Sequence, residues 1–491
     1  MGAETAETEA EPRPASSFDP RRTIVLGACG SVLVLVASFA AAAGSVAHPF
    51  LTGGLAWLTY GHGRMLAELV VYLGYALLVL AWIRLGRLAI ADRVGARPVV
   101  VAAVCWTVPM VFAPALFTRD VFSYLAQGVV ALGGYDPFTV APTVLGHGSE
   151  ILNNVHPFWQ GTPAPYGPLF ILVAKGVGVL VGEHVYAGIV LTRLVQLVGL
   201  GLLLWALPGL VRHLGGKLPV ALWLLVAGPL TVVHLVGGPH NDLMMIGFLA
   251  AGTLLMLDRR HVAGIAVVTL GVAVKASAAV ALPFLVWVWA ARLSSTRWRN
   301  FARACACSLG VFVVVFGVST LLAGVNLGWL TMVNASSRLV NWLAPPTAAG
   351  ELVHGLVNVV VEVPRDPFVT VTRILGTAVL VVLLVRQWWL ARETGADGVD
   401  AVRRAAIGLF LVAVLSPTML PWYLTWGLAI GAALPWRPRW LAVAAGVSVF
   451  MVAPYSAAGE QLLYEWPLMF LAVALSAFAG YSLVRPRVAR V

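Results

Sequence analysis

The chain has 491 residues, of which 60% are hydrophobic and only 11% are charged. Soluble domains carry about 25% charged residues, so this composition excludes an ordinary soluble protein. The formal net charge is +11, but the basic residues lie in short loops between apolar runs, which is typical of a membrane protein and argues against nucleic acid as a partner. The sequence predicts an all-α polytopic protein embedded in the lipid bilayer.

Residues 1–20 are rich in Ala, Glu, Thr and Pro and lack apolar periodicity, which predicts a disordered cytoplasmic tail. Apolar runs then begin, and the first three cover about 23–43, 66–86 and 99–116. Arginines follow the second run, so that end is expected inside. The third run therefore crosses to the opposite side of the membrane, where residues 117–166 form an outer loop.

The run 167–182 is short and Gly-rich, and another run, 185–208, follows at once. If both cross the membrane, the basic residues at 212–217 fall outside. If 167–182 is a juxtamembrane or re-entrant helix, every later basic loop falls inside, and we prefer this alternative. It predicts a single transmembrane domain, 21–491, with roughly 13–14 spans, cytoplasmic termini, and a second long outer loop at 326–367.

The first outer loop gathers the polar and aromatic candidates of the chain. An ionisable group at a membrane boundary is costly unless it is paired or has a function. We therefore treat this loop as the candidate catalytic segment. Its candidate site residues are Arg119, Asp120, Tyr124, Gln127, Asp136, His156, Trp159 and Tyr166.

Two later outer segments add polar residues near the membrane. The stretch GGPHNDLMM (237–245) places His240, Asn241 and Asp242 at the start of a helix. Helix capping and a polar binding site both explain them. Lys275 lies in an otherwise apolar stretch, where its ammonium group can either reach the membrane surface or contact an anion.

Two further outer segments complete the candidate set. Arg338 and Asn341 lie in NASSRLVNW, within the second long outer loop. Trp422 and Tyr423 lie in SPTMLPWYLTW. Aromatic residues at a membrane edge form an interfacial belt, and they also serve as platforms for sugars, so these two interpretations are compatible.

The residue types favour sugar transfer from a lipid phosphate. The sequence contains no phosphate-binding glycine loop, GxSxG, HExxH or metal-ligand spacing, and its four cysteines lie in apolar runs. An acceptor hydroxyl needs one base, for which Asp120 is the candidate. A departing phosphate needs cations, for which Lys275 and Arg338 are the first candidates and Arg119 the next. We expect no metal and no cofactor.

Several blocks resemble one family of enzymes. The chain looks like the polyprenyl-phosphate-mannose-dependent α-1,6-mannosyltransferases of actinobacteria, members of the GT-C superfamily. The blocks are TRDVFSYLAQG (118–128), GYDPF (134–138), APYGPLFILVAK (164–175), HLVGGPHNDLMMIG (234–247), VKASAAVALPFLVWVW (274–289), LGWL (327–330), NWLAPPTAA (341–349) and LPWYLTW (420–426).

The resemblance implies a GT-C fold with juxtamembrane helices in an outer loop, and an active site on the periplasmic face of the plasma membrane. It implies decaprenyl-phosphomannose as donor, a growing α-1,6-mannan lipid as acceptor, and inversion with Asp120 as base. The blocks are most similar to the enzyme that elongates the lipomannan and lipoarabinomannan backbone. The sister enzyme that initiates this backbone is the alternative, and a transporter or lipid-sugar flippase is a more distant one.

One departure from related enzymes is visible. Related phosphatidylinositol-mannoside mannosyltransferases carry histidines after a late Ser-Pro pair. Here Ser416 and Pro417 are followed by TMLPWYLTW, which contains no histidine. A role for such a histidine is therefore not transferred to this chain.

Overall fold

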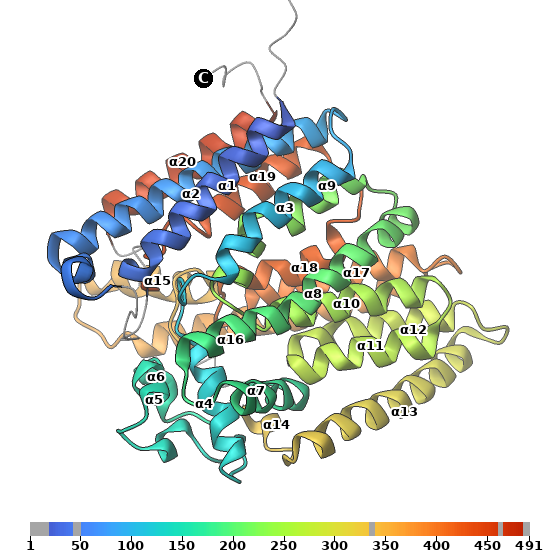
Figure 1. Ribbon diagram of the computed structural model, residues 1–491. Coiled ribbons are helices and arrows are strands. Elements are labelled where there is room, and N and C mark those ends of the chain that lie inside the picture. Colours follow the sequence, from blue (N-terminus) through green and yellow to red (C-terminus); the bar gives the residue numbers. More distant parts are fainter. Residues whose placement is uncertain (1–18, 43–50, 333–338, 460–464, 485–491) are drawn as a thin grey trace, which may run out of the picture.

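The computed structural model describes residues 19–42, 51–332, 339–459 and 465–484. Helices account for all the regular secondary structure in these ranges, as the composition predicts (Figure 1). The α-helices are α1 (Pro20–Ala41), α2 (Gly61–Ile90), α3 (Ala96–Val111), α4 (Asp120–Leu132), α5 (Glu150–Asn154), α6 (Pro157–Gln160), α7 (Pro168–Val181), α8 (Val185–Leu214), α9 (Leu218–Ala221), α10 (Asp242–Leu257), α11 (His261–Val274), α12 (Leu282–Ala290), α13 (Arg297–Ala323), α14 (Trp329–Met332), α15 (Pro345–Asn358), α16 (Asp366–Ala391), α17 (Val399–Leu415), α18 (Leu424–Gly431), α19 (Pro438–Phe450) and α20 (Trp466–Val484).

Shorter turns of tighter or wider helix connect these elements. Two segments are π-helical, and each such turn widens the backbone ladder, a feature that often marks functional sites. The 3₁₀ turns are η1 (Gly53–Thr59), η2 (Pro142–Leu145), η5 (Ala276–Ala281) and η7 (Pro421–Tyr423), and the π-helices are η3 (Leu222–Val226) and η4 (Leu230–Gly237).

Six helices are individually long and apolar enough to cross a membrane: α1, α2, α8, α13, α16 and α20. The pair formed by residues 218–226 and 230–237, bent by 41°, makes a seventh candidate. Several other expected spans are apolar helices of 10–17 residues. Helix length and composition alone therefore give fewer spans among the described residues than the expected 13–14. Short and broken helices take the place of full spans around a polar interior.

The N-terminal boundary differs slightly from expectation. Helix α1 begins at Pro20, and the carboxylate of Asp19 accepts a hydrogen bond from the backbone N–H of Arg21 at 2.9 Å. Asp19 and Pro20 therefore belong to a capped helix start rather than to a disordered tail. Residues 1–18, on which the rest of that prediction falls, lie outside the described residues.

The structure favours the juxtamembrane alternative for residues 167–182. Helix α7 has 14 residues, or about 21 Å at 1.5 Å per residue, which is short of a hydrocarbon core of about 30 Å. Lys217, just after α8, forms an ion pair with Asp92, just after α2. These two helix ends therefore lie on the same face. If α7 were an additional full span, α8 would run in the opposite direction and end on the other face.

The other expected inside loops meet on this same face. Arg292 donates hydrogen bonds to the carbonyl oxygens of Leu257 at 3.1 Å and Ala396 at 2.8 Å. Arg297 binds both carboxylate oxygens of Glu393 at 2.8 Å. The loops after α10, α12 and α16 are thus tied together, and the basic residues gather at one end of the bundle.

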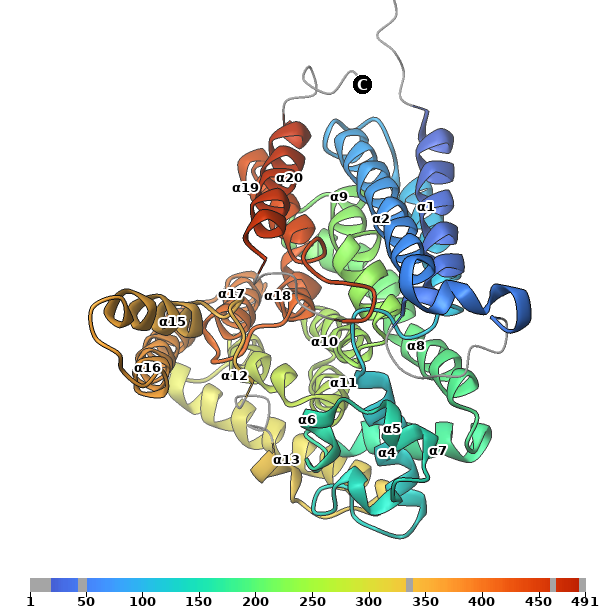
Figure 2. The same ribbon diagram turned by 90° about the vertical axis from the view of Figure 1, so that its left-hand side faces the viewer.

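The outer segments form the opposite end. Figure 1 shows α1, α2, α8 and α13 running roughly parallel, and the short helices α4 to α7 cluster at one end of this bundle. Figure 2 shows that the pair α15 and α16 projects on another side. The predicted outer loop 117–166 is therefore itself built of short helices, as expected for juxtamembrane elements.

Candidate active site

Asp120 stands at the first position of α4, on a sharp change of chain direction. Phe117 adopts a left-handed φ of 63°, which is unusual for an aromatic residue. The backbone N–H of Asp120 donates to the hydroxyl of Thr118 at 3.1 Å. A carboxylate at a helix N-terminus faces the positive end of the helix dipole, which stabilises its ionised form.

A second short segment between two helices carries His240 and Asn241 and leads into Asp242. The π-helix η4 ends at Gly237, and α10 begins at Asp242. Asn241 precedes α10 without a capping hydrogen bond from its side chain, so the simple capping explanation does not hold for it. Its side-chain amide is buried, and both amide atoms lack a partner among the described residues. Such a group is costly to bury unless a ligand satisfies it.

His240 brings this segment into contact with the segment that carries Asp120. Its Nδ1 lies 3.4 Å from Oδ2 of Asp120, an ion-pair distance without hydrogen-bond alignment. Its ring stacks on that of Trp422, with 3.4 Å between centroids and 20° between planes. The His240 side chain is 1% exposed, whereas that of Asp120 is 23% exposed. The carboxylate therefore faces open space while the imidazole stands behind it.

Asp242 and Lys275 form a second charged pair nearby. The Lys275 ammonium lies 2.7 Å from Oδ2 of Asp242, and Nε1 of Trp426 donates to Oδ1 of the same carboxylate at 2.6 Å. The ammonium also lies 4.9 Å from the ring centroid of Tyr423. Asp242 thus has two partners, and the charge of Lys275 is already compensated in this structure.

Two cavities meet at Asp120. The first, of about 300 Å³, has five aromatic side chains in its lining, and we call it the aromatic cavity. Trp159, Trp422 and Asp120 line both cavities. The aromatic cavity is lined by Asp120, Trp159, Pro165, Tyr166, Lys275, Ala276, Ser277, Leu339, Val412, Ser416, Pro417, Thr418, Leu420, Trp422, Tyr423 and Trp426.

The second cavity, of about 750 Å³, is lined by two arginines and a histidine, and we call it the basic cavity. Arg64, Arg119 and His156 line it. The Arg119 guanidinium forms no hydrogen bond or ion pair with any residue that the structure describes, whereas Arg64 lies 3.7 Å from Glu68 on an exposed helix turn. An uncompensated guanidinium facing a cavity is suited to an anionic ligand.

The environment of Asp120 favours its ionised form. Partial burial by itself raises the pKa of this carboxyl, but the contacts with His240, the hydroxyl of Thr118 and the charge of Lys275 together outweigh burial. The net pKa of Asp120 is lowered from its ordinary value. At neutral pH the group is therefore a carboxylate, as a base must be before it accepts a proton.

Comparison with known proteins identifies the family. Residues 24–291 match the family described as α-(1→6)-mannopyranosyltransferase, N-terminal domain. The chain belongs to this α-(1→6)-mannopyranosyltransferase family. Residues 346–485 match the family described as the MptB C-terminal domain. No solved structure matches the chain.

Named relatives agree with this family. The chain is 39% identical to α-(1→6)-mannopyranosyltransferase A of Mycobacterium tuberculosis, over 94% of this chain and 89% of that protein. It is 31% identical to α-(1→6)-mannopyranosyltransferase A of Corynebacterium glutamicum, over 86% and 90% of the two chains. With α-(1→6)-mannopyranosyltransferase B of the same organism, identity is 27% over 77% and 67%. The protein is thus a multi-pass membrane mannosyltransferase.

The structure brings half of the predicted site residues of this mannosyltransferase to the lining of the two cavities. His240 contacts Asp120 and Trp422, and Asp242 contacts Lys275 and Trp426, so both stand behind residues that line the aromatic cavity. Tyr124 packs edge-on against Tyr166, with 5.0 Å between ring centroids, and supports it from behind. The predicted residues that line the cavities are Arg119, Asp120, His156, Trp159, Tyr166, Lys275, Trp422 and Tyr423.

Three further predicted residues in the described part of the chain line neither cavity. Asp136 accepts hydrogen bonds from the backbone N–H groups of Phe138 and Asn326, so it joins the two outer loops. Asn341 donates to the Met419 carbonyl at 3.0 Å and pins one outer segment to another. Gln127 is buried on α4 and lines neither cavity. Arg338 lies outside the described residues.

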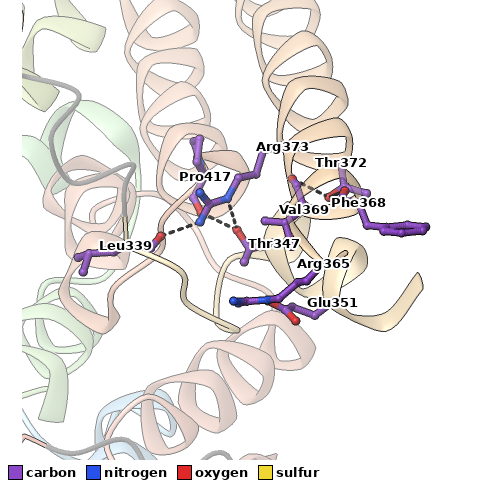
Figure 3. A network of polar contacts seen from close by, with 9 residues as sticks. All are labelled: Leu339, Thr347, Glu351, Arg365, Phe368, Val369, Thr372, Arg373 and Pro417. Atoms are coloured by element: carbon purple, nitrogen blue, oxygen red, sulfur yellow. Dashed lines mark hydrogen bonds and ion pairs between the residues drawn. The ribbon is translucent and has the colours of Figure 1, made fainter. Parts of the chain in front are cut away.

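Sequence reasoning missed Arg373, which shapes the wall of the aromatic cavity. Figure 3 shows its guanidinium directed toward Thr347 and the Leu339 carbonyl, at 2.9 Å and 2.6 Å. Thr347 in turn donates to the carbonyl of Pro417 at 2.7 Å. Because Leu339 and Pro417 line that cavity, Arg373 on α16 fixes two of its walls. An arginine within an apolar run was the available signal.

Proposed function

We propose that this mannosyltransferase transfers mannose from polyprenyl (decaprenyl) phosphomannose to a growing α-1,6-mannan lipid. In this proposal it has a GT-C architecture and elongates the backbone of lipomannan and lipoarabinomannan. The active site faces the periplasm, because the basic loops gather at the opposite end of the bundle. The position of Asp120, at the junction of two cavities of different chemical character, is the observation that carries the proposal.

The aromatic cavity suits the acceptor sugar. Trp159, Tyr166 and Tyr423 offer flat apolar faces to the C–H surfaces of a pyranose. Lys275 faces the same space, and its remaining N–H groups can donate to sugar hydroxyls while Asp242 balances its charge. We therefore assign Lys275 to a sugar hydroxyl of the acceptor, rather than to the phosphate expected from the sequence, because Asp242 already compensates its charge.

The basic cavity suits the donor phosphate. Arg119 provides a guanidinium that no carboxylate of the described residues compensates, and Arg64 lies on the same cavity. A guanidinium can bind two phosphate oxygens at once, which places the sugar of the donor toward Asp120. Arg338 remains a candidate for the same phosphate.

The chemical step needs one base. The acceptor hydroxyl oxygen forms a bond to C1 of mannose, the bond from C1 to the phosphate oxygen breaks, and the configuration at C1 inverts. The hydroxyl proton passes to the Asp120 carboxylate, and polyprenyl phosphate leaves with the bonding electron pair. Because a phosphate departs without protonation, a second carboxylic acid is unnecessary, in contrast to the paired carboxylates of glycosidases.

The test uses the full chain in lipid nanodiscs with labelled polyprenyl phosphomannose and α-1,6-oligomannosides of defined length. We expect transfer to the longer acceptors with inversion at C1. Transfer restricted to the shortest acceptors would assign the initiating role instead. Uptake or flipping of the labelled lipid without a new glycosidic bond would overturn the enzymatic proposal in favour of a transporter or flippase.

A further inference from the structure

A buried arginine in the first third of α8 links the two segments that lead to Asp120 and His240. The side chain of Arg193 is among the largest fully buried ones in the described part of the protein. No acidic residue of the described chain pairs with it; its partners are backbone carbonyl oxygens. Its guanidinium donates hydrogen bonds to those of Val111, Ala113, Pro114, Val236 and Gly237.

The five carbonyls belong to two segments far apart in the sequence. Three lie at the end of α3 and just beyond it, in the segment that leads to Asp120. The bond from Nη2 to Pro114 is 2.8 Å. The other two lie at the end of η4, in the segment that leads to His240, and the bond from Nη2 to Gly237 is 2.6 Å. One guanidinium therefore holds both segments.

These contacts explain how a charge is accommodated within a membrane helix. The last carbonyls of a helix lack partners within that helix and carry the negative end of its dipole. The ends of α3 and η4 both point at Arg193, so carbonyl dipoles replace the missing carboxylate. One turn later on α8, Gln196 donates to the Pro239 carbonyl at 3.1 Å and holds the same segment.

We propose that Arg193 is a positioning residue that sets the separation of Asp120 and His240 by clamping the segments on which they stand. This inference rests on the proposed function for its kinetic consequences only. Leu116 supports it, because its backbone N–H donates to the Gly237 carbonyl at 3.3 Å, so the two clamped segments also contact each other directly. Loosening the clamp moves the base relative to its imidazole partner without removing any group that contacts substrate.

The first experiment measures kinetics of Arg193→Lys in the full chain. Lysine keeps the charge but cannot form five bonds in the geometry of a guanidinium. We expect kcat to fall about 10²-fold with the KM values of both substrates little changed, as for a misplacement of about 1 Å. Arg212→Lys, at the exposed end of the same helix, is the matched control and should retain wild-type kcat.

The second experiment separates positioning from a general loss of structure and does not depend on activity. A water-soluble carbodiimide modifies protonated carboxyls, and mass spectrometry follows modification of Asp120 as pH is varied. We expect the pH midpoint to rise in Arg193→Lys and in His240→Gln, and to rise no further in the double variant. The charged and titratable groups around Asp120 that stay constant in this comparison are Arg119, Tyr124, His156, Tyr166, Asp242 and Lys275.

Each outcome decides the inference. An unchanged midpoint in Arg193→Lys, or shifts that add in the double variant, would show that Arg193 acts independently of the pair. If Arg193→Lys does not fold, Gln196→Leu, which removes only the Pro239 contact, should show a smaller shift in the same direction, and its absence would overturn the clamp. If the variants show the midpoint shifts but the wild-type protein transfers no mannose, the proposed function is refuted and the positioning role of Arg193 stands.

Discussion

Nδ1 of His240 lies 3.4 Å from Oδ2 of Asp120, while the His240 ring stacks on Trp422. Three separate outer segments therefore converge on one carboxylate. The carboxylate faces two cavities, and the imidazole stands behind it with neither ring nitrogen hydrogen-bonded to a described residue. This relationship links the ionisation state of the base to a residue that does not line either cavity.

Asp120→Asn should retain the fold and lose activity. The amide preserves the shape of the side chain but cannot accept the acceptor proton, and loss of a general base costs about 10²–10⁴-fold. We expect this decrease in kcat with an unchanged elution profile in detergent. Asp258→Asn, in an ion pair with His213 on the opposite face, is the matched control. Turnover like that of the wild type in Asp120→Asn would remove this residue from the mechanism.

His240→Gln should move the acid limb of the pH profile of kcat to higher pH. Burial raises the pKa of Asp120, and the contact with His240 is the largest effect that lowers it. Removing the imidazole therefore raises the pKa of the base, which is active only above that pKa. The variant should lose most activity at acidic pH and least at neutral pH. An acid limb at the wild-type position would contradict an influence of His240 on Asp120.

Arg119→Ala should weaken use of the donor more than use of the acceptor. Loss of a hydrogen bond to a charged group costs about 1.5–3 kcal/mol, which corresponds to a rise of about tenfold or more in the donor KM. Lys275→Met should instead raise mainly the acceptor KM, because Asp242 already compensates this ammonium. The reverse pattern in the two variants would exchange the assignments of the two cavities.

Asp242→Asn should destabilise the protein. It leaves the Lys275 ammonium, which is 17% exposed, without its carboxylate partner. Breaking a buried ion pair by removing one partner costs about 3–5 kcal/mol. Thermal unfolding in detergent should show a lower Tm, and the double variant with Lys275→Met should recover part of the loss. Equal Tm values for the single and double variants would show that the pair is not coupled.

Thiol labelling should establish the sidedness of the two faces. In a background without the native cysteines, His147→Cys should react with an impermeant reagent from outside, and Ala396→Cys should not. Both positions are exposed. Pro239, in contrast, is buried, so a cysteine there would report little about topology. Labelling at 396 but not at 147 would show that the orientation in the membrane is the reverse of the one proposed.

The sequence by itself determined that the protein is all-α and has several membrane-spanning helices. Hydropathy and the placement of arginines are local properties of the chain, so they can be read without knowing the fold. The same reading selected Asp120, because a carboxylate directly after an apolar run is costly unless it functions. The short blocks around it were sufficient to indicate the family.

Polarity alone was a poor guide to the role of each remaining residue. Asp136 and Asn341 are as polar as the cavity residues, yet each binds backbone groups of another outer segment. Lys275 has no acidic neighbour in the sequence, but Asp242 lies beside it in the fold. A side chain's partner depends on which distant segment packs against it, and no local pattern contains that information.

Only the tertiary structure decided that Asp120 stands against His240, that two cavities meet at this carboxylate, and that Arg193 binds the ends of two helices at once. Each of these features joins segments that fold into separate helices. Their energy depends on distances of a few ångströms between groups that are remote along the chain, whereas hydropathy depends on neighbours within one turn or one span. For this reason the helical, membrane-embedded class was predictable from the sequence, and the arrangement of the base and its partners was not.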